Sequence, residues 1–302
     1  MLIPRAALTE LEAALRAPRG GLRTAAVELD VDPLELVRAG AGVFGSAVFF
    51  AGPAGQAVGG LGVAWSVEAA GPERFGLLDG DLRGALPDAM GAVLGFAFNP
   101  GGPCSPEWDG FPAATAVVPQ LAVWQRDGSS RLCVAVPAGA SPAGVLAAAG
   151  MLRRPGPPEV PPGVGPPHPL PPVAEWVGRV REAVAAIRSG TPAKVVLARA
   201  QRVVLERAAD AFDLVAVLRD RCPGCYAYGW QAGPAALVGA SPELLVSRAG
   251  ERFAARPLAG SARRGADPEE DRRLGDRLLT DPKEQAEHAF VAEEVASRLA
   301  PF

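Results

Sequence analysis

The sequence is poor in histidine, lysine, tyrosine and methionine, with two, two, two and three of these among 302 residues. The two histidines, His168 and His288, are too few for a histidine-rich metal centre, and they argue against a Ser-His-Asp hydrolase. Alanine, glycine, proline and arginine are abundant instead. We interpret this bias as a coding preference without functional weight.

Strong charge and long hydrophobic runs are also missing. The net charge of −3 gives no support for a nucleic-acid partner. Early acids, Glu10 and Glu12, interrupt any secretory signal. The uncharged stretch 39–67 is broken repeatedly by glycine and proline, so it predicts buried strands rather than a membrane span. We therefore expect a cytoplasmic protein without nucleic-acid or membrane partners.

The four cysteines do not form a metal-ligand pattern. Cys222 and Cys225 make a CxxC, which is open to interpretation as a redox pair or half a zinc site. Cys104 and Cys133 are not closely paired and have no histidines nearby, and the CxxC precedes a strand-like run instead of opening a helix. The pattern favours an ordinary turn.

A proline-rich segment divides the chain. Residues 154–172 are expected to form an extended connector without regular helix or sheet. Residues 1–153 precede it and are strand-rich, with strands expected at 92–98, 114–124 and 132–136. Residues 173–302 follow it and make up the second region.

The second region alternates helices and strands. Apolar spacing predicts a helix over 176–187 that stops at Gly190, and a second helix near 211–219. Strands are predicted at 194–199, 202–206, 226–231 and 252–255, with a hairpin over 235–248. Asp281, Pro282 and Glu284 predict the last helix, as N-cap, first residue and the acid that closes a capping box.

Lys194 opens the β-branched run 194–198. On a strand, Val195 and Leu197 would point to a core while Lys194 faces the other way. A lysine that faces a cavity can lose its proton more easily and serve as a base, although an edge-strand lysine usually serves only solubility.

Three further features could carry chemistry. Glu243 follows a Ser-Pro turn before apolar residues, which could desolvate its carboxyl and raise its pKa, as a general acid requires; the alternative is an exposed turn acid. The small-residue loop 257–261 could bring backbone N–H groups to an anionic substrate, or be an ordinary turn. Glu287 begins the apolar stripe of the last helix, where a carboxylate needs a cation or another partner, and Mg²⁺ is a natural candidate.

The order and spacing of these features resemble the chorismate-utilising enzymes: isochorismate synthases, salicylate synthases, and the large subunits of anthranilate and aminodeoxychorismate synthases. The resemblance covers about residues 173–302. The matching blocks are Lys-Val-Val-Leu-Ala-Arg at 194–199, Gly-Ala-Ser-Pro-Glu-Leu-Leu at 239–245, Arg-Pro-Leu-Ala-Gly-Ser-Ala-Arg-Arg-Gly at 256–265, and Asp-Pro-Lys-Glu-Gln-Ala-Glu-His at 281–288. The first region is similar mainly through Gly-Phe-Ala-Phe at 95–98.

The resemblance implies a role for each candidate residue. Lys194 matches the lysine that activates water in the water-using members, where ammonia-using members usually have glutamine. Ala259 stands where one class of aminodeoxychorismate synthase has a nucleophilic lysine, so no covalent intermediate is expected. The remaining matches are the general acid Glu243, the substrate-contacting pair Gly260 and Ser261, and the Mg²⁺-site acids Glu287 and Glu284.

The implied protein is a Mg²⁺-dependent isochorismate synthase that acts on chorismate and feeds menaquinone or siderophore synthesis. The alternatives are a salicylate synthase and a truncated, non-catalytic remnant, because family members continue well beyond His288. The implied fold is an α+β sandwich of two large antiparallel sheets flanked by helices, incomplete at its C-terminal end. A full-length form is expected to be a monomer.

Overall fold

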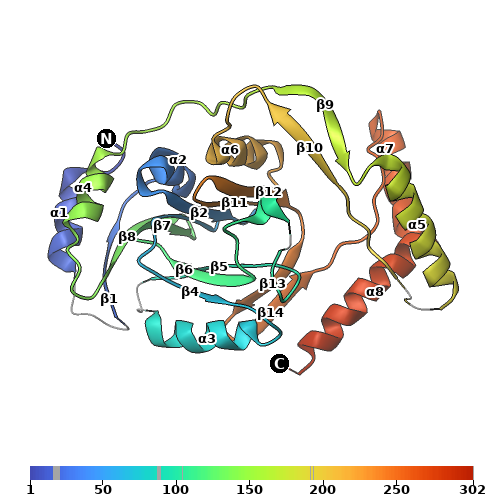
Figure 1. Cartoon of the computed structure of the whole chain (residues 1–302), viewed down its shortest axis with the longest axis horizontal. Coiled ribbons are helices and arrows are strands. Elements are labelled where there is room, and N and C mark those ends of the chain that lie inside the picture. The colour runs from blue at the N-terminus through green and yellow to red at the C-terminus, as the bar shows by residue number, and fades with distance from the viewer. Residues whose placement is uncertain (16–20, 87–89, 104, 191, 193, 302) are drawn as a thin grey trace. The chain divides into compact units, whose positions relative to one another are not determined.

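The computed structural model describes residues 1–302 apart from 16–20, 87–89, 104, 191, 193 and 302 (Figure 1). Cys104 therefore lies outside the described residues. The described chain forms two compact units, which we call unit 1 (1–160 with 209–241) and unit 2 (161–208 with 242–302). The sequence-based boundaries at 153/154 and 172/173 stay a prediction; the structure adds that 209–241 fold with the first part of the chain.

A seven-stranded antiparallel sheet forms the centre of unit 1 (Figure 1). Its inner strands are rich in small and β-branched residues, and the strands at 57–61 and 129–137 bury most of their residues. In spatial order its strands are β1 (Leu22–Glu28), β8 (Ser129–Pro137), β7 (Leu121–Arg126), β3 (Ala57–Leu61), β2 (Ser46–Ala51), β11 (Tyr226–Ala232) and β12 (Ala235–Ser241).

A three-stranded antiparallel sheet completes the sandwich of unit 1. Its strands, in spatial order, are β4 (Trp65–Ala69), β6 (Ala114–Val118) and β5 (Val93–Phe96). Val118 of this sheet packs with Cys133 and Ala135 of the larger sheet in one buried cluster. The single strand predicted over 114–124 is wrong, because Pro119 and Gln120 separate β6 from β7 and the two strands belong to different sheets.

Helices cover the outer faces of unit 1. Helices α2 and α6 pack against the seven-stranded sheet, and α6 buries Phe212 and Val215 there (Figure 1). Asp32 and Asp210 cap these two helices by accepting backbone N–H bonds, a role that aspartate often takes at an N-cap. The helices of unit 1 are α1 (Arg5–Ala14), α2 (Pro33–Phe44), α3 (Arg74–Ala85), the 3₁₀-helix η1 (Pro106–Trp108), α4 (Ala143–Met151) and α6 (Ala211–Arg221).

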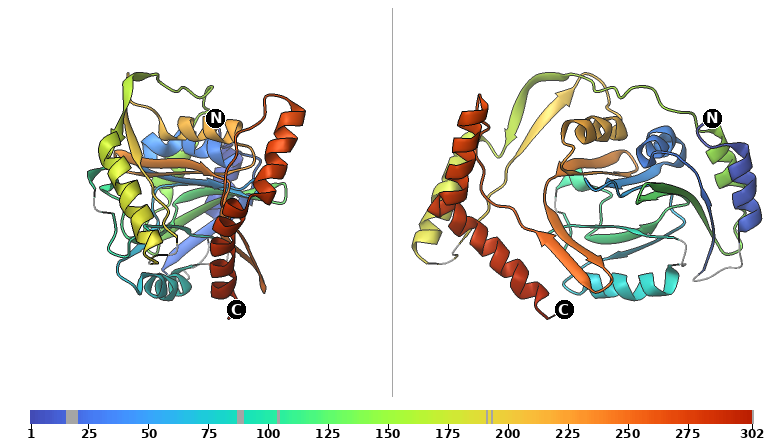
Figure 2. Two further views of the ribbon diagram at one scale, coloured as in Figure 1. Left: turned by 90° about the vertical axis from the view of Figure 1, so that its right-hand side faces the viewer. Right: turned by 180° about the vertical axis from the view of Figure 1, so that it is seen from behind.

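Unit 2 is built of helices and two separate two-stranded sheets (Figure 2). Its helices contain no buried residue. The elements of unit 2 are β9 (Gly163–Leu170), α5 (Val173–Arg188), β10 (Ala200–Leu205), β13 (Leu244–Ala249), β14 (Arg252–Arg256), α7 (Pro268–Thr280) and α8 (Pro282–Leu299).

Three local predictions for this part of the chain are wrong. The proline-rich connector contains β9, which pairs with β10; a two-stranded sheet has only edge strands, and these tolerate proline. Residues 194–199 form no strand, since β10 begins at Ala200; of the two residues predicted to face a core, Leu197 is exposed and Val195 is only partly buried. The hairpin expected over 235–248 does not form: β12 pairs with β11, and β13 pairs with β14.

Other predictions are confirmed. The α+β class with antiparallel sheets and flanking helices is correct. Helix α5 ends before Gly190, whose φ of 93° suits glycine. The CxxC is a turn closed by a 3.0 Å hydrogen bond from the Cys225 N–H to the Cys222 carbonyl. None of the described helices has the length and apolar character that crossing a bilayer requires.

Candidate active site

The residues of the candidate site come from four places in unit 2. Lys194 lies in the irregular segment between α5 and β10, and Glu243 lies in the turn before β13. Gly260 and Ser261 lie in the loop after β14, while Glu284 and Glu287 belong to the first two turns of α8. The structure therefore has to bring together segments that are far apart in the chain.

The start of helix α8 is fixed by local chemistry. Pro282 occupies its first turn, and the Asp281 carboxylate accepts hydrogen bonds from the N–H groups of Lys283 (2.9 Å) and Glu284 (3.2 Å). The Asp281 N–H donates to the Arg277 carbonyl and so ends α7. Asp281 therefore caps both helices. In the predicted capping box the Glu284 side chain would accept a hydrogen bond from the Asp281 N–H, but that N–H binds the Arg277 carbonyl instead.

Glu284 and Glu287 point their carboxylates at the same cation. The Lys283 ammonium nitrogen lies 3.1 Å from Glu284 Oε1 and 3.0 Å from Glu287 Oε1. These hydrogen bonds, the one to Glu287 first, raise the pKa of Lys283 above its ordinary value. The two carboxylates thus converge on one point beside the first turn of α8.

Lys194 contacts the same helix. Its Nζ donates a 3.0 Å hydrogen bond to the backbone carbonyl of Glu287, across 93 residues of sequence. The lysine is half-buried. It does not stand on a strand as predicted, but the structure places its amine beside the residue predicted as a metal ligand.

The glycine loop approaches Glu284 from β14. Gly260 has a φ of 86°, and a Cβ at this position would lie 2.6 Å from Glu284 Oε2. The positive φ disfavours any side chain here, and a side chain would also require the Glu284 carboxylate to shift. Ser261 follows directly and is exposed. The structure therefore brings the predicted substrate loop against the predicted metal-site acid.

Glu243 is joined to the same loop. Its Oε1 accepts a 3.2 Å hydrogen bond from the Leu258 N–H, two residues before Gly260. The side chain is exposed, so the predicted desolvation by apolar neighbours is wrong for this structure. The hydrogen bond still connects Glu243 to the loop that approaches Glu284. Through this loop and the contacts of Lys283 and Lys194, all six predicted residues are linked to the start of α8.

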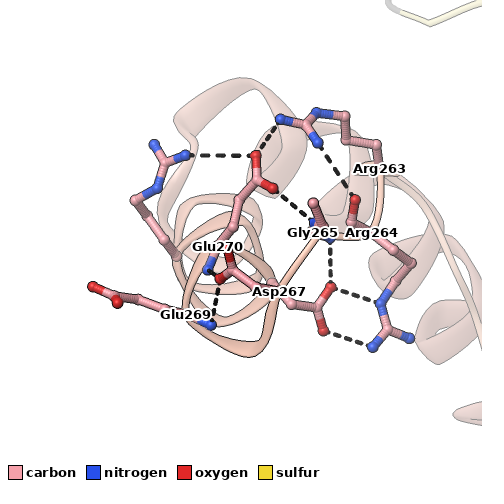
Figure 3. Close-up of polar contacts among 9 residues, drawn as sticks. Arg263, Arg264, Gly265, Asp267, Glu269 and Glu270 are labelled. Atoms are coloured by element: carbon pink, nitrogen blue, oxygen red, sulfur yellow. Dashed lines mark hydrogen bonds and ion pairs between the residues drawn. The ribbon is translucent and has the colours of Figure 1, made fainter.

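Two features of this region escaped the sequence analysis. Lys283 received no role, although its i,i+4 spacing from Glu287 is a recognisable helix-pair signal. The second is the ion-pair network that holds the loop end on α7 (Figure 3). Arg264 binds Asp271 through two bonds of 2.7 and 2.6 Å, and Arg263 binds Glu270. No short-range spacing rule reveals such i,i+7 pairs.

The same ion pairs also fix the end of the glycine loop, where the chain leads into α7. The Gly265 N–H donates to Asp271 Oδ1 at 2.8 Å (Figure 3). A Cβ on Gly265 would lie 2.1 Å from the Asp271 nitrogen. The Arg264 guanidinium, followed by the Gly265 N–H, lowers the pKa of Asp271 to about 2. The loop is therefore held by its bond to Glu243 and by the contacts at the start of α7, and it passes close to Glu284.

Metal-ligating side chains are few in this region. Among the residues that the structure describes, no group of three or more His, Cys, Asp or Glu side chains could hold a metal ion. Glu284 and Glu287 supply two carboxylates, which is the number that Mg²⁺ often takes from a protein when substrate oxygens and water complete its shell.

Comparison with known proteins identifies the family. The sequence profile described as "Chorismate binding enzyme" matches residues 9–302, nearly the whole chain. The chain belongs to the chorismate-binding enzyme family. The sequence-based resemblance is thereby confirmed, and it extends into unit 1.

Individual members of the family are similar over different lengths. "Salicylate biosynthesis isochorismate synthase" of Pseudomonas aeruginosa is 31% identical over 260 residues, or 80% of this chain and 54% of that protein. "Anthranilate synthase component 1" of Haloferax volcanii is 39% identical over 119 residues, or 39% of this chain and 22% of that protein. The chain thus spans about half the length of the first of these relatives.

A solved member shows the same fold. The structure of MenF, the menaquinone-specific isochorismate synthase from Escherichia coli, matches with a TM-score of 0.77 at 21% identity. The match covers 98% of this chain and 68% of that one. At this level of identity the likeness establishes the chorismate-binding fold and leaves the reaction to be argued from the site.

Proposed function

We propose that this chain carries the catalytic site of an isochorismate synthase, which exchanges a ring hydroxyl of chorismate for one from water. The Pseudomonas aeruginosa relative, 31% identical over 80% of this chain, has isochorismate synthase in its name. We further propose that the protein works in the cytoplasm and that its product feeds menaquinone or catechol siderophore synthesis.

Lys194 is the proposed base. The observation that carries the proposal is its 3.0 Å hydrogen bond to the Glu287 carbonyl, which holds the amine at the acidic start of α8. An unprotonated amine can donate an N–H there and still use its lone pair to take a proton from water. Arginine could make the contact but could not act as this base, because it stays protonated.

Glu243 is the proposed acid, and the glycine loop is the proposed substrate contact. Glu243 gives a proton to the departing hydroxyl, which leaves as water, while Lys194 takes one from the attacking water. Proton return between turnovers restores both groups. The loop around Gly260 and Ser261 offers backbone N–H groups and a hydroxyl to an anionic substrate, and the substrate would cover the exposed Glu243 carboxyl.

Magnesium fits the two converging carboxylates. The positions of Glu284 and Glu287 about one ammonium nitrogen show that both can face a single cation. Carboxylate oxygens are the ligands that Mg²⁺ prefers. Bound there, Mg²⁺ would neutralise these acids and bind a substrate carboxylate. We assign Glu287 and Glu284 to this role.

The test is a pair of substitutions at Lys194, made in the natural protein that contains this chain. Lys194→Ala should lower chorismate turnover on the order of a hundredfold or more while chorismate still binds. Lys194→Arg keeps a donor to the Glu287 carbonyl and should lose as much. Product quantification by chromatography checks both. Near-normal turnover in the arginine variant would exclude Lys194 as the base.

Product analysis separates the alternatives. With chorismate and Mg²⁺ the expected product is isochorismate. Salicylate with pyruvate as the main products would establish a salicylate synthase, which shares the lysine and adds an elimination step. Anthranilate formed with ammonia would contradict the role of Lys194 in activating water.

A further inference from the structure

The chain uses arginine for nearly all of its cationic side chains. It has 28 arginines and only two lysines, Lys194 and Lys283. Both lysines contact Glu287: Lys194 binds its backbone carbonyl, and Lys283 binds its carboxylate. Other ion pairs of unit 2, such as Arg264 with Asp271 and Arg298 with Glu294, use guanidinium groups. The two lysines are thus concentrated at the candidate active site.

The geometry of Lys283 differs from that of the arginine pairs. One nitrogen lies at 3.0 and 3.1 Å from oxygens of two different carboxylates. A compact ammonium with three donors can sit between two acids in this way, whereas a planar guanidinium favours two parallel bonds to one carboxylate, as Arg264 makes. Lys283 therefore stands where a small cation shared by Glu284 and Glu287 would stand.

We propose that Lys283 is an internal counter-cation, which a divalent metal ion must displace from Glu284 and Glu287. This inference rests on the proposed function, which assigns the metal to those two acids. Lys283 keeps the carboxylates paired when the metal is away, and its release lets their negative charge face the metal. The lysine thus lowers the affinity of the site for its metal.

The surroundings allow this exchange without unfolding. The Lys283 side chain is 72% exposed, so it can turn into solvent, whereas the Glu284 and Glu287 side chains are 21% and 40% exposed. Glu284 also lies close to the loop at Gly260, where a Cβ would be 2.6 Å from Glu284 Oε2. The lysine is the most exposed of the three side chains and therefore the group that can leave.

The first measurement is the affinity of the unmodified chain and its variants for Mn²⁺. The electron spin resonance signal of free Mn²⁺ reports how much of the metal is bound. Exposed ion pairs are individually weak, so Lys283→Gln should tighten binding by about three- to tenfold. Arg298→Gln, the matched control, removes an i,i+4 pair from the same helix and should change affinity less than about twofold. Glu287→Gln should weaken binding.

The second measurement observes the lysine itself. In a protein labelled with ¹⁵N-lysine only two side-chain Nζ signals are expected, since the chain has two lysines. Titration with diamagnetic Mg²⁺ should move the Lys283 signal toward that of a solvated lysine. The Lys194 signal, from a group that binds a carbonyl, should move less.

The outcomes separate this inference from the proposed function. If Glu287→Gln weakens Mn²⁺ binding but Lys283→Gln leaves it unchanged, the metal site stands and the counter-cation role is wrong. A Lys283 signal that does not move while Mg²⁺ saturates the site would also overturn the role. If neither the unmodified chain nor Lys283→Gln binds Mn²⁺, both the inference and the proposed metal site fail, whereas the roles of Lys194 and Glu243 are tested by turnover.

Discussion

The two units are stabilised by different physics. Among the residues that the structure describes, the three buried hydrophobic clusters belong to unit 1, including Phe49 and Phe212, whereas helices α5, α7 and α8 of unit 2 have no buried residue. In unit 2 the clearest contacts are polar: the Asp267 and Asp281 caps, the Arg264–Asp271 pair and the bonds to Glu287.

The candidate chemistry lies in the unit that has the less buried core. Polar and charged side chains remain accessible there, as a site for an anionic substrate and a cation requires. Apolar burial does not determine where such side chains point. Their positions depend on caps, a glycine approach and ion pairs, which are individually weak and act together. The comparison predicts that the units respond differently to the same kind of change.

The largest difference is expected for phenylalanine deletion. Phe212 is fully buried against Gly229, so Phe212→Ala should cost about 3–5 kcal/mol of unfolding free energy, from lost transfer energy and the cavity left behind. Phe290 on α8 is 47% exposed, and Phe290→Ala should cost less than about 1 kcal/mol. Chemical denaturation of both variants checks this. Equal losses would show that α8 is held by apolar packing after all.

A smaller effect is expected for loss of a helix cap. Asp281 and Asp210 each bind two backbone N–H groups, and substitution by alanine should cost about 1 kcal/mol in either case. Helix α6 is also held by Phe212 and Val215, so only α8 should fray.

Amide hydrogen exchange measures the effect of losing each cap separately. Amide exchange should accelerate at Lys283 and Glu284 in Asp281→Ala, but much less at Phe212 and Asp213 in Asp210→Ala. Asp281→Asn, which keeps a capping oxygen, should restore slow exchange. Equal acceleration at both helices would contradict the contrast between the units.

The smallest effect is expected when the Arg264–Asp271 ion pair of unit 2 is exposed to acidic pH. The pKa of Asp271 is lowered from an ordinary 3.8 to about 2, first by the Arg264 guanidinium and then by the Gly265 N–H. Because the folded pKa is the lower one, the stabilisation is present above about pH 4 and is lost as the pH falls through about 2.

The start of α7 should therefore loosen between these pH values, before the core of unit 1 opens. Amide exchange at Gly265, compared with that at Ala227 in the core, measures the loosening across the pH range. The variant Asp271→Asn should remove this pH dependence. A Gly265 amide equally protected at pH 2 and pH 5 would show that the ion pair does not hold the loop.

Much of the local structure could be predicted from the sequence. Asp281 and Pro282 predicted where α8 begins, and the apolar spacing before Gly190 predicted α5, because capping and helical periodicity act over a few neighbouring residues. The four motif blocks indicated the family because each is a short run of neighbouring residues that can be recognised without the fold. The roles given to Lys194, Glu243, Gly260, Ser261, Glu284 and Glu287 stay predictions until the substitutions are made.

The tertiary structure decided which distant segments meet. Strand pairing joins residues 209–241 to unit 1 and separates β12 from β13, although the sequence predicted one hairpin there. The contact of Lys194 with Glu287 spans 93 residues, and the alignment of Gly260 with Glu284 depends on how β14 and α7 direct the loop. Local propensity carries no information on such pairings, because they follow from the path of the whole chain. The sequence by itself determined the residue types of the site, and the fold determined that they face one another.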